Sequence, residues 1–318
     1  MTDVKISSYN IHSCVGTDGK YSVERVTRVI RDGGASIICI QETEVNDIYL
    51  QNRVWSSTHC DNQPSIIATM VGFQYHVFVP AIKSRASSRS KEIHSDAYNI
   101  DVSGNFSDGQ SEGKFTQPLQ QRRRDDMGKF GIAILSKYPI LQVQTHQYKR
   151  YKHKTIRNAM ACLISLPNNK FLWIVNTHLG CHFIGKEQQQ QAKELIVFIN
   201  SLAMNRPENI LGIVLCGDLN CPPWYQSVRT TIQQSGLHDT ISLTHGPKSS
   251  YGTFPSGSRL LGIPTCFFRK LLRLDYIFVR ELPERRLVFC RFVGVQDDSS
   301  ICSLASDHLP ICAMFTIG

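Results

Sequence analysis

The chain has 318 residues, of which 42% are apolar and 19% are charged. This composition is typical of a folded globular protein, and the length suffices for one large domain or two ordinary ones. No apolar run reaches the roughly 18 residues of a membrane-spanning helix, and the start, MTDVKISSYN, has no apolar segment typical of a secretory signal.

Lysine and arginine together number 35 against 26 acidic residues, which gives a formal net charge of +9. A basic chain attracts polyanions such as nucleic acid, an anionic lipid surface or polyphosphate, although a solvated basic surface without a partner is equally compatible. The 11 cysteines are scattered singly, without C-x2-C spacing. This pattern favours reduced, buried thiols in an intracellular protein, cytoplasmic or nuclear, over a disulfide framework or a zinc site.

Strands and helices alternate along the chain. Residues 4–9 alternate like a half-buried strand, and residues 21–34 have apolar side chains at helical spacing, with Ser22 as N-cap and Gly33-Gly34 as a stop. Further helices are predicted at 188–204 and 226–236, and further strands at 36–40, 130–135, 159–166, 171–177, 210–216, 274–279, 286–293 and 309–315. Frequent strands with few, spaced helices predict an α/β protein with two packed sheets and helices outside.

Residues 83–127 break this pattern, because they are polar, rich in serine and glycine and poor in aliphatic side chains. Segments of this length without regular structure are usually functional or disordered. We expect a flexible insertion here, although Arg122-Arg123-Arg124 near its end could bind phosphate groups.

Polar residues that can bind metal or transfer protons stand at the ends of six predicted strands. Taken singly, each has an ordinary explanation as a turn, cap or solvated residue. Six such places at the ends of apolar strands point instead to one shared rim of the sheets. The residues are Asn10, Glu42, Asn176 with His178, Asp218 with Asn220, Asp275, and Asp307 with His308.

These residue types suit hydrolysis at phosphorus. A divalent ion held by carboxylate oxygens neutralises charge on a phosphodiester, and Mg²⁺ prefers one or two carboxylates, which fits Glu42 assisted by Asn10. Asp218 is placed to activate a water while Asn220 holds the phosphate, and Asp275 with His308 can form an acid–histidine pair.

The elements YN, QE, NTHL, GDLN, LDYIFV and SDH, in this order, resemble the endonuclease/exonuclease/phosphatase superfamily. The resemblance runs from residue 4 to residue 316, apart from the 83–127 segment, and so implies a single domain over 1–318. It also implies a DNase I-like four-layer α/β sandwich, in which two central mixed β-sheets are flanked by helices.

The resemblance further implies Mg²⁺ or Mn²⁺ as cofactor. Glu42 matches the principal metal-binding glutamate of the superfamily, Asn10 the asparagine beside it, and Asp307 a further acid near the metal. Asp218 and Asn220 match the general base and its substrate-positioning partner.

On the same resemblance, His308 matches the histidine that contacts the scissile phosphate, and Asp275 matches its orienting acid. His178 matches the NTHL histidine of the nuclease and deadenylase branches. Arg157 stands where many members have a phosphate-contacting arginine, although its surroundings, KRYKHKTIR, are basic throughout and could be a solvated charge run. Asn176, at the same strand end as His178, is assigned to substrate binding.

The sequence defines the substrate class within the superfamily less well than it defines the reaction. The tryptophan-containing elements of inositol phosphatases and abasic-site enzymes are absent, and the basic balance favours nucleic acid. Alternatives are a lipid or small-molecule phosphoesterase, such as a neutral sphingomyelinase or an inositol phosphate phosphatase, and an inactive binding module. Basic clusters at 122–124, 149–157 and 269–273 could follow a nucleic-acid backbone, and Tyr148, Tyr151, Phe267 and Phe268 could stack on bases or simply pack in the core.

Overall fold

Two six-stranded mixed sheets form the centre of the protein. The computed structural model describes residues 2–45, 61–83, 129–151, 156–181, 185–204, 209–222, 225–246, 252–256, 259–260, 263–264, 272–282, 287–292 and 304–317. The expected insertion at 83–127 lies outside the described residues except for Lys83, and so does Arg122-Arg123-Arg124.

The first sheet has the strand order β13-β14-β1-β2-β4-β3, and the second has the order β5-β6-β7-β8-β12-β9. Each contains one parallel pair, β1 with β2 and β7 with β8, and its other described pairs are antiparallel. The first sheet consists of β1 (Thr2–Asn10), β2 (Ile37–Val45), β3 (Tyr75–Lys83), β4 (Lys129–Ser136), β13 (Leu287–Phe292) and β14 (Ile311–Ile317). The second consists of β5 (Ile140–Gln147), β6 (Asn158–Leu166), β7 (Lys170–His178), β8 (Ile210–Asp218), β9 (His238–Asp239) and β12 (Asp275–Arg280), and β10 (Arg259–Leu260) pairs separately with β11 (Ile263–Pro264).

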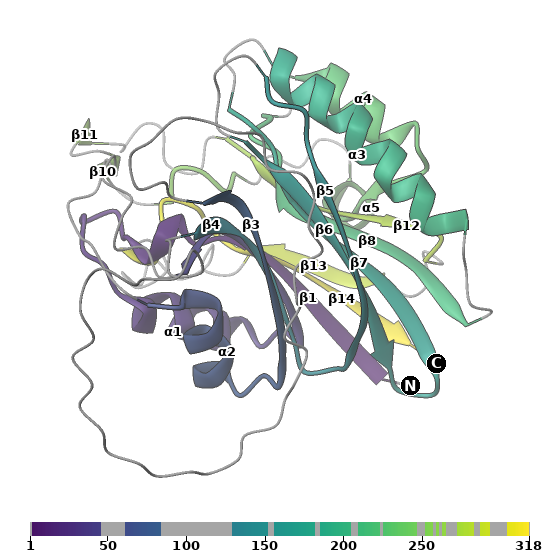
Figure 1. Cartoon of the computed structure of the whole chain (residues 1–318), viewed down its shortest axis with the longest axis horizontal. Coiled ribbons are helices and arrows are strands. Elements are labelled where there is room, and N and C mark those ends of the chain that lie inside the picture. The colour runs from purple at the N-terminus through teal and green to yellow at the C-terminus, as the bar shows by residue number, and fades with distance from the viewer. Residues whose placement is uncertain are drawn as a thin grey trace, which may run out of the picture.

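Helices cover the outer face of each sheet, so the expected four layers are observed (Figure 1). Apolar side chains of α1 (Val23–Gly33) and α2 (Gln63–Val71) pack on the first sheet, and those of α3 (Lys186–Met204) and α4 (Gln226–Gln233) pack on the second. A third apolar cluster fills the space between the sheets. Within the described ranges the remaining helices are the short α5 (Thr240–His245) and the single turn η1 (His12–Cys14). Among the helices described, none has both the length and the apolar character needed to cross a membrane.

Capping residues and apolar runs explain which helices and strands could be predicted from the sequence. The side chain of Ser22 accepts the backbone N–H of Arg25, and Gly34 ends α1 in the left-handed conformation with φ 63°, as predicted. The strands β3 and β5 were not predicted, because each lies at the edge of its sheet. An edge strand such as β5, with most of its side chains at least partly exposed, lacks the apolar run that marks a central strand.

A buried amide bridge joins the two sheets between the middle of β2 and the carboxyl end of β7. The Nδ2 group of Asn176 donates to the backbone oxygens of Ile40 (2.9 Å) and Ala133 (2.8 Å), both in the first sheet. Its Oδ1 accepts from Nε2 of Gln41 at 2.7 Å. Asn176 and Gln41 are both fully buried, so these hydrogen bonds have no competition from water and fix how the sheets meet.

We expect Asn176→Ala to lower the free energy of unfolding by about 3 kcal/mol, because two backbone oxygens and the Gln41 amide lose a buried partner. Urea denaturation measures this loss. The control is Thr69→Ala, which removes an exposed hydroxyl bonded to the oxygen of Ser65 and should change stability by no more than about 0.5 kcal/mol. A loss in Asn176→Ala no larger than that of the control would contradict the bridge.

Candidate active site

Strand pairing places three predicted site residues side by side in the second sheet. The end of β8 lies between β7, which is parallel to it, and β12, which is antiparallel. In this register Asp218 is opposite both His178 and Asp275. Residues that are 40 or more positions apart thus become neighbours, as the strand-end pattern predicted.

Gly217 permits this close approach. A Cβ atom at this position would lie 2.2 Å from the backbone oxygen of Thr177, which no side chain could tolerate without displacing β7. The glycine before Asp218 therefore lets the two parallel strands meet tightly directly beneath the site.

The first sheet contributes the ends of β1 and β2 from the opposite side. Asn10 donates through Nδ2 to Oδ2 of Asp218 at 2.9 Å, and its Oδ1 accepts the backbone N–H of His12 at 3.0 Å. Oε1 of Glu42 lies 3.7 Å from Nε2 of His178, and 23% of the Glu42 side chain is exposed. Glu42 has φ 54° at a register shift between β2 and β4, so the strand turns there and presents the carboxylate at the rim.

The segment before β14 supplies the last two predicted residues. Nδ1 of His308 lies 2.8 Å from Oδ2 of Asp275, and its Nε2 lies 3.8 Å from Oδ2 of Asp218. Ser306 anchors this segment, since its hydroxyl donates to the backbone oxygen of Asn10 at 2.8 Å and accepts the N–H of His308 at 3.2 Å. Oδ1 of Asp307 lies 3.6 Å from Nδ1 of His12.

The electrostatics of Asp218 suit proton transfer near neutral pH. Burial raises the pKa of this carboxyl from 3.8 to about 7, with a further increase from Asp275, although His308 and the hydrogen bonds from Asn10 and Asn220 oppose the shift. Those hydrogen bonds hold both oxygens, because the backbone N–H of Asn220 donates to Oδ1 at 2.7 Å while Asn10 donates to Oδ2. Asp218 is 1% exposed.

The two histidines are driven to opposite charge states. For His308, burial disfavours the charged form, but Asp275 and Asp218 outweigh it and raise its pKa well above 6.5. For His178, burial, the Arg157 guanidinium and His308 all lower the pKa well below 6.5. His308 is therefore an imidazolium between two carboxylates, and His178 is a neutral imidazole.

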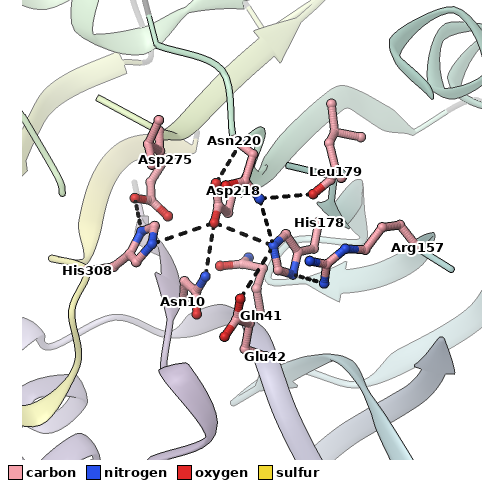
Figure 2. Close-up of polar contacts among 12 residues, drawn as sticks. Asn10, Gln41, Glu42, Arg157, His178, Leu179, Asp218, Asn220, Asp275 and His308 are labelled. Carbon is pink, nitrogen blue, oxygen red and sulfur yellow. Dashed lines mark hydrogen bonds and ion pairs between the residues drawn. The ribbon is translucent and has the colours of Figure 1, made fainter. Parts of the chain in front are cut away.

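His178 has a polar neighbour at each ring nitrogen (Figure 2). A terminal nitrogen of Arg157 lies 3.0 Å from Nδ1, and Nδ2 of Asn220 lies 3.0 Å from Nε2. Asn220 also donates to the backbone oxygen of Leu179 at 3.0 Å, and its φ of 45° turns the chain back toward the site. Two residues that were predicted at different strand ends, Asn220 and His178, are thus in direct contact.

The donor set fits a divalent cation. Asp218 and Asp275 offer carboxylate oxygens that lie, together with a ring nitrogen of the protonated His308, within 4.8 Å of one another. Oδ1 of Asp275 is buried and has no hydrogen-bond partner among the described residues, although a buried carboxylate oxygen normally has one. Carboxylate oxygens are the ligands that Mg²⁺ and Mn²⁺ prefer, and Glu42 adds a partly exposed carboxylate that lies 3.7 Å from Nε2 of His178, the same atom that faces Asp218.

Several residues that the sequence analysis assigned to contact with substrate or nucleic acid are buried in the structure. Asn176 is fully buried and its amide bonds backbone and Gln41, so we correct its assignment from substrate binding to joining the sheets. Arg273, expected in a basic surface cluster, is 5% exposed, pairs with Asp239 and lies 4.4 Å above the Tyr276 ring. Tyr148 is buried and bonds Thr177, so it packs in the core; Phe267 and Phe268 lie outside the described residues.

Residues that the sequence did not single out support the site. Thr253 accepts the backbone N–H groups of Leu274 (3.1 Å) and Asp275 (3.3 Å) and so fixes the start of β12. The ring of Phe254 lies 5.0 Å from that of His308. Thr253 and Phe254 lie outside the strands and outside the sequence elements that resemble the superfamily, so no local pattern in the sequence would have linked them to the site.

We expect the metal-free protein to lose stability as the pH rises from about 6 to 8, because the unfolded chain releases the Asp218 proton near pH 3.8 and the His308 proton near 6.5, whereas the folded protein keeps the first until about pH 7 and the second to higher pH. Asp218→Asn should reduce this loss by on the order of 1 kcal/mol. Thermal unfolding at several pH values in the presence of a chelator measures the effect. Asp32→Asn, an exposed site on α1, is the control, and an identical pH dependence in both variants would contradict the shifted pKa.

Comparison with known proteins shows the family and the fold of the chain. The family model described as "Endonuclease/Exonuclease/phosphatase family" matches residues 7–308, and a search of curated proteins finds no match. An endonuclease/exonuclease/phosphatase structure from Beutenbergia cavernae is 17% identical, with a TM-score of 0.66 over 100% of this chain and 72% of that chain.

Two other solved structures share the fold at similar distance. The mannosyl-6-phosphatase Bt3783 from Bacteroides thetaiotaomicron is 13% identical, with a TM-score of 0.61 over 99% of this chain and 100% of that one. The human Nocturnin catalytic domain with bound sulfate anion is 15% identical, with a TM-score of 0.58 over 99% of this chain and 95% of that one. With its DNase I-like fold and a family match that covers nearly its whole length, the chain is a member of the endonuclease/exonuclease/phosphatase family of phosphoesterases.

Proposed function

We propose that the protein is a divalent-metal-dependent phosphodiesterase that hydrolyses phosphodiester bonds in nucleic acid, as an endonuclease or exonuclease. The observation that carries this proposal is the buried Asp218 carboxylate, with its pKa near 7, held between a neutral and a charged histidine where the ends of two sheets meet.

Asp218 is the general base in this proposal. A base works best when its pKa lies near the working pH, and burial gives Asp218 that property. The hydrogen bonds from Asn10 and from the backbone of Asn220 fix both carboxylate oxygens, so the group is oriented before a water arrives.

His308 is the cationic group in this proposal. Asp275 accepts the proton on Nδ1, which leaves the N–H at Nε2 to face Asp218 and the site. A charged donor of this kind stabilises negative charge on a phosphoryl oxygen or on the departing oxygen. Asn220 and His178 add neutral groups on the other side of Asp218.

Mg²⁺ or Mn²⁺ is the cofactor that this donor set supports. Glu42 and Asp307, with Oδ1 of Asn10, would hold it at the partly exposed rim, and the buried oxygens of Asp218 and Asp275 lie behind them. When bound, the cation would neutralise charge on the phosphoryl group.

The net charge of +9 supports nucleic acid as the substrate class, because a basic protein attracts a phosphate backbone. A lipid or small-molecule phosphoester, including an inositol phosphate, is the second candidate, since a protein of the same fold is named a mannosyl-6-phosphatase. Among the described residues the cysteines form no disulfide and all but Cys181 are buried, which supports an intracellular location in cytoplasm or nucleus. We further propose one domain over 1–318, with residues 83–127 as a flexible insertion.

The substrate class is tested by Mg²⁺-dependent product release from single-stranded DNA and RNA, duplex DNA with and without an abasic site, sphingomyelin and an inositol polyphosphate. We expect cleavage of a nucleic acid, and we expect Glu42→Ala to require more Mg²⁺ because a carboxylate ligand is lost. Glu24→Ala, at an exposed acid on α1, is the control. Cleavage of the lipid or inositol phosphate alone would overturn the nucleic-acid assignment, and silence on every substrate would favour a binding module.

The role of Asp218 is tested separately. We expect Asp218→Asn to lower kcat by at least about 10²-fold, since the base is lost, while the circular dichroism spectrum and substrate binding stay close to those of the wild type. Asp32→Asn should leave kcat unchanged. Turnover in Asp218→Asn close to the wild-type rate would remove Asp218 from the mechanism.

A further inference from the structure

The contact between Arg157 and His178 restricts where the imidazole can carry its proton. All nitrogens of a guanidinium are donors, and the group stays protonated at any physiological pH. Its terminal nitrogen lies 3.0 Å from Nδ1 of His178, so a hydrogen bond there requires a lone pair on Nδ1. The single proton of the neutral ring then belongs to Nε2.

The Nε2 side of the ring faces the proposed reaction centre. Nε2 lies 3.6 Å from Oδ2 of Asp218 and 3.7 Å from Oε1 of Glu42, which are contacts too long for strong hydrogen bonds. Figure 2 shows His178 between these carboxylates and Arg157, with the guanidinium on the far side of the ring.

Asn220 places a second donor at the same position. Its Nδ2 group lies 3.0 Å from Nε2 and already donates one hydrogen to the backbone oxygen of Leu179. Two N–H groups cannot satisfy one another, so the Nε2–H of His178 and the remaining Nδ2–H of Asn220 both need an acceptor from elsewhere. An oxygen atom of an anionic ligand beside Asp218 would accept both.

Arg157 is held in this position from two directions. Its backbone oxygen accepts the N–H of Tyr148 at 3.0 Å, which fixes the chain just before β6. Its guanidinium carbon lies 5.9 Å from the centre of the Phe130 ring on β4. The side chain is therefore placed to act on His178 before any substrate arrives.

We propose that Arg157 is a positioning residue that holds His178 as the Nε2–H tautomer, so that His178 and Asn220 together donate to one phosphoryl oxygen of the substrate. In this arrangement His178 serves as a hydrogen-bond donor, and neither as a base nor as a metal ligand through Nε2. The expected effect of Arg157 on turnover rests on the proposed phosphodiesterase function. The assignment of the His178 tautomer does not depend on that function.

The tautomer is measured directly by nitrogen NMR of the histidine rings in the metal-free, substrate-free protein. The spectra of wild type, Arg157→Lys and Arg157→Met are compared, with Arg28→Met at an exposed site on α1 as control. We expect an unprotonated Nδ1 and a protonated Nε2 in wild type, in the control and in Arg157→Lys, which keeps a charged donor. Arg157→Met should populate the Nδ1–H form. A wild-type signal from the Nδ1–H tautomer, or no change in a folded Arg157→Met, would overturn the proposal.

A double-mutant cycle with His178→Asn then separates an action through His178 from direct contact with substrate. We expect Arg157→Met to lower kcat by about tenfold or more in the wild-type background, and by less than about twofold when His178 is already replaced. An equal rise in KM in both backgrounds would show that Arg157 binds substrate directly, against the proposal. If no substrate is turned over by the wild type, the proposed function fails while the NMR result still decides the role of Arg157.

Discussion

The position of Asp218, at the end of a central strand between β7 and β12, is the constraint around which the rest of the site is arranged. An ionised carboxylate at 1% exposure is costly unless nearby groups compensate it. Asn10 and the backbone of Asn220 bond its oxygens, and His308 supplies positive charge. These partners come from β1 of the first sheet and from the two segments that follow β8 and precede β14, so the site exists only when the whole sandwich is assembled.

The opposite charge states of the two histidines follow from their neighbours. His308 has a carboxylate at Nδ1, which favours the charged ring, whereas His178 has a guanidinium at Nδ1, which excludes it. Two titratable groups of one type are thereby given different tasks by their surroundings, as in other sites that combine acid and base chemistry. The shared neighbour of both is Oδ2 of Asp218, which lies 3.6 Å from Nε2 of His178 and 3.8 Å from Nε2 of His308.

The junction of the sheets is polar where the site needs fixed geometry and apolar elsewhere. The amide bridge between Gln41 and Asn176 lies one residue from Glu42 and two from His178. It ties the strand that carries the partly exposed carboxylate to the strand that carries the neutral histidine. Deeper between the sheets, aliphatic side chains provide stability without such directional preference.

The sequence alone predicted the central strands, the helices α1, α3 and α4 but not α2, and the candidate site residues that the fold brings together, because apolar runs, caps and strand-end acids are local signals. The predicted Ser22 cap is confirmed, and the helix predicted at 188–204 buries Leu195, Ile199 and Leu202 as part of α3. Only the tertiary structure decided that Asn176 joins the sheets, that Arg273 is buried against Asp239 and that Arg157 contacts His178. Each of these contacts depends on strand order, on a bulge such as the one at Glu42, or on a partner far away in the chain. The residues next to each position in the sequence do not show which distant residue will lie beside it in the fold.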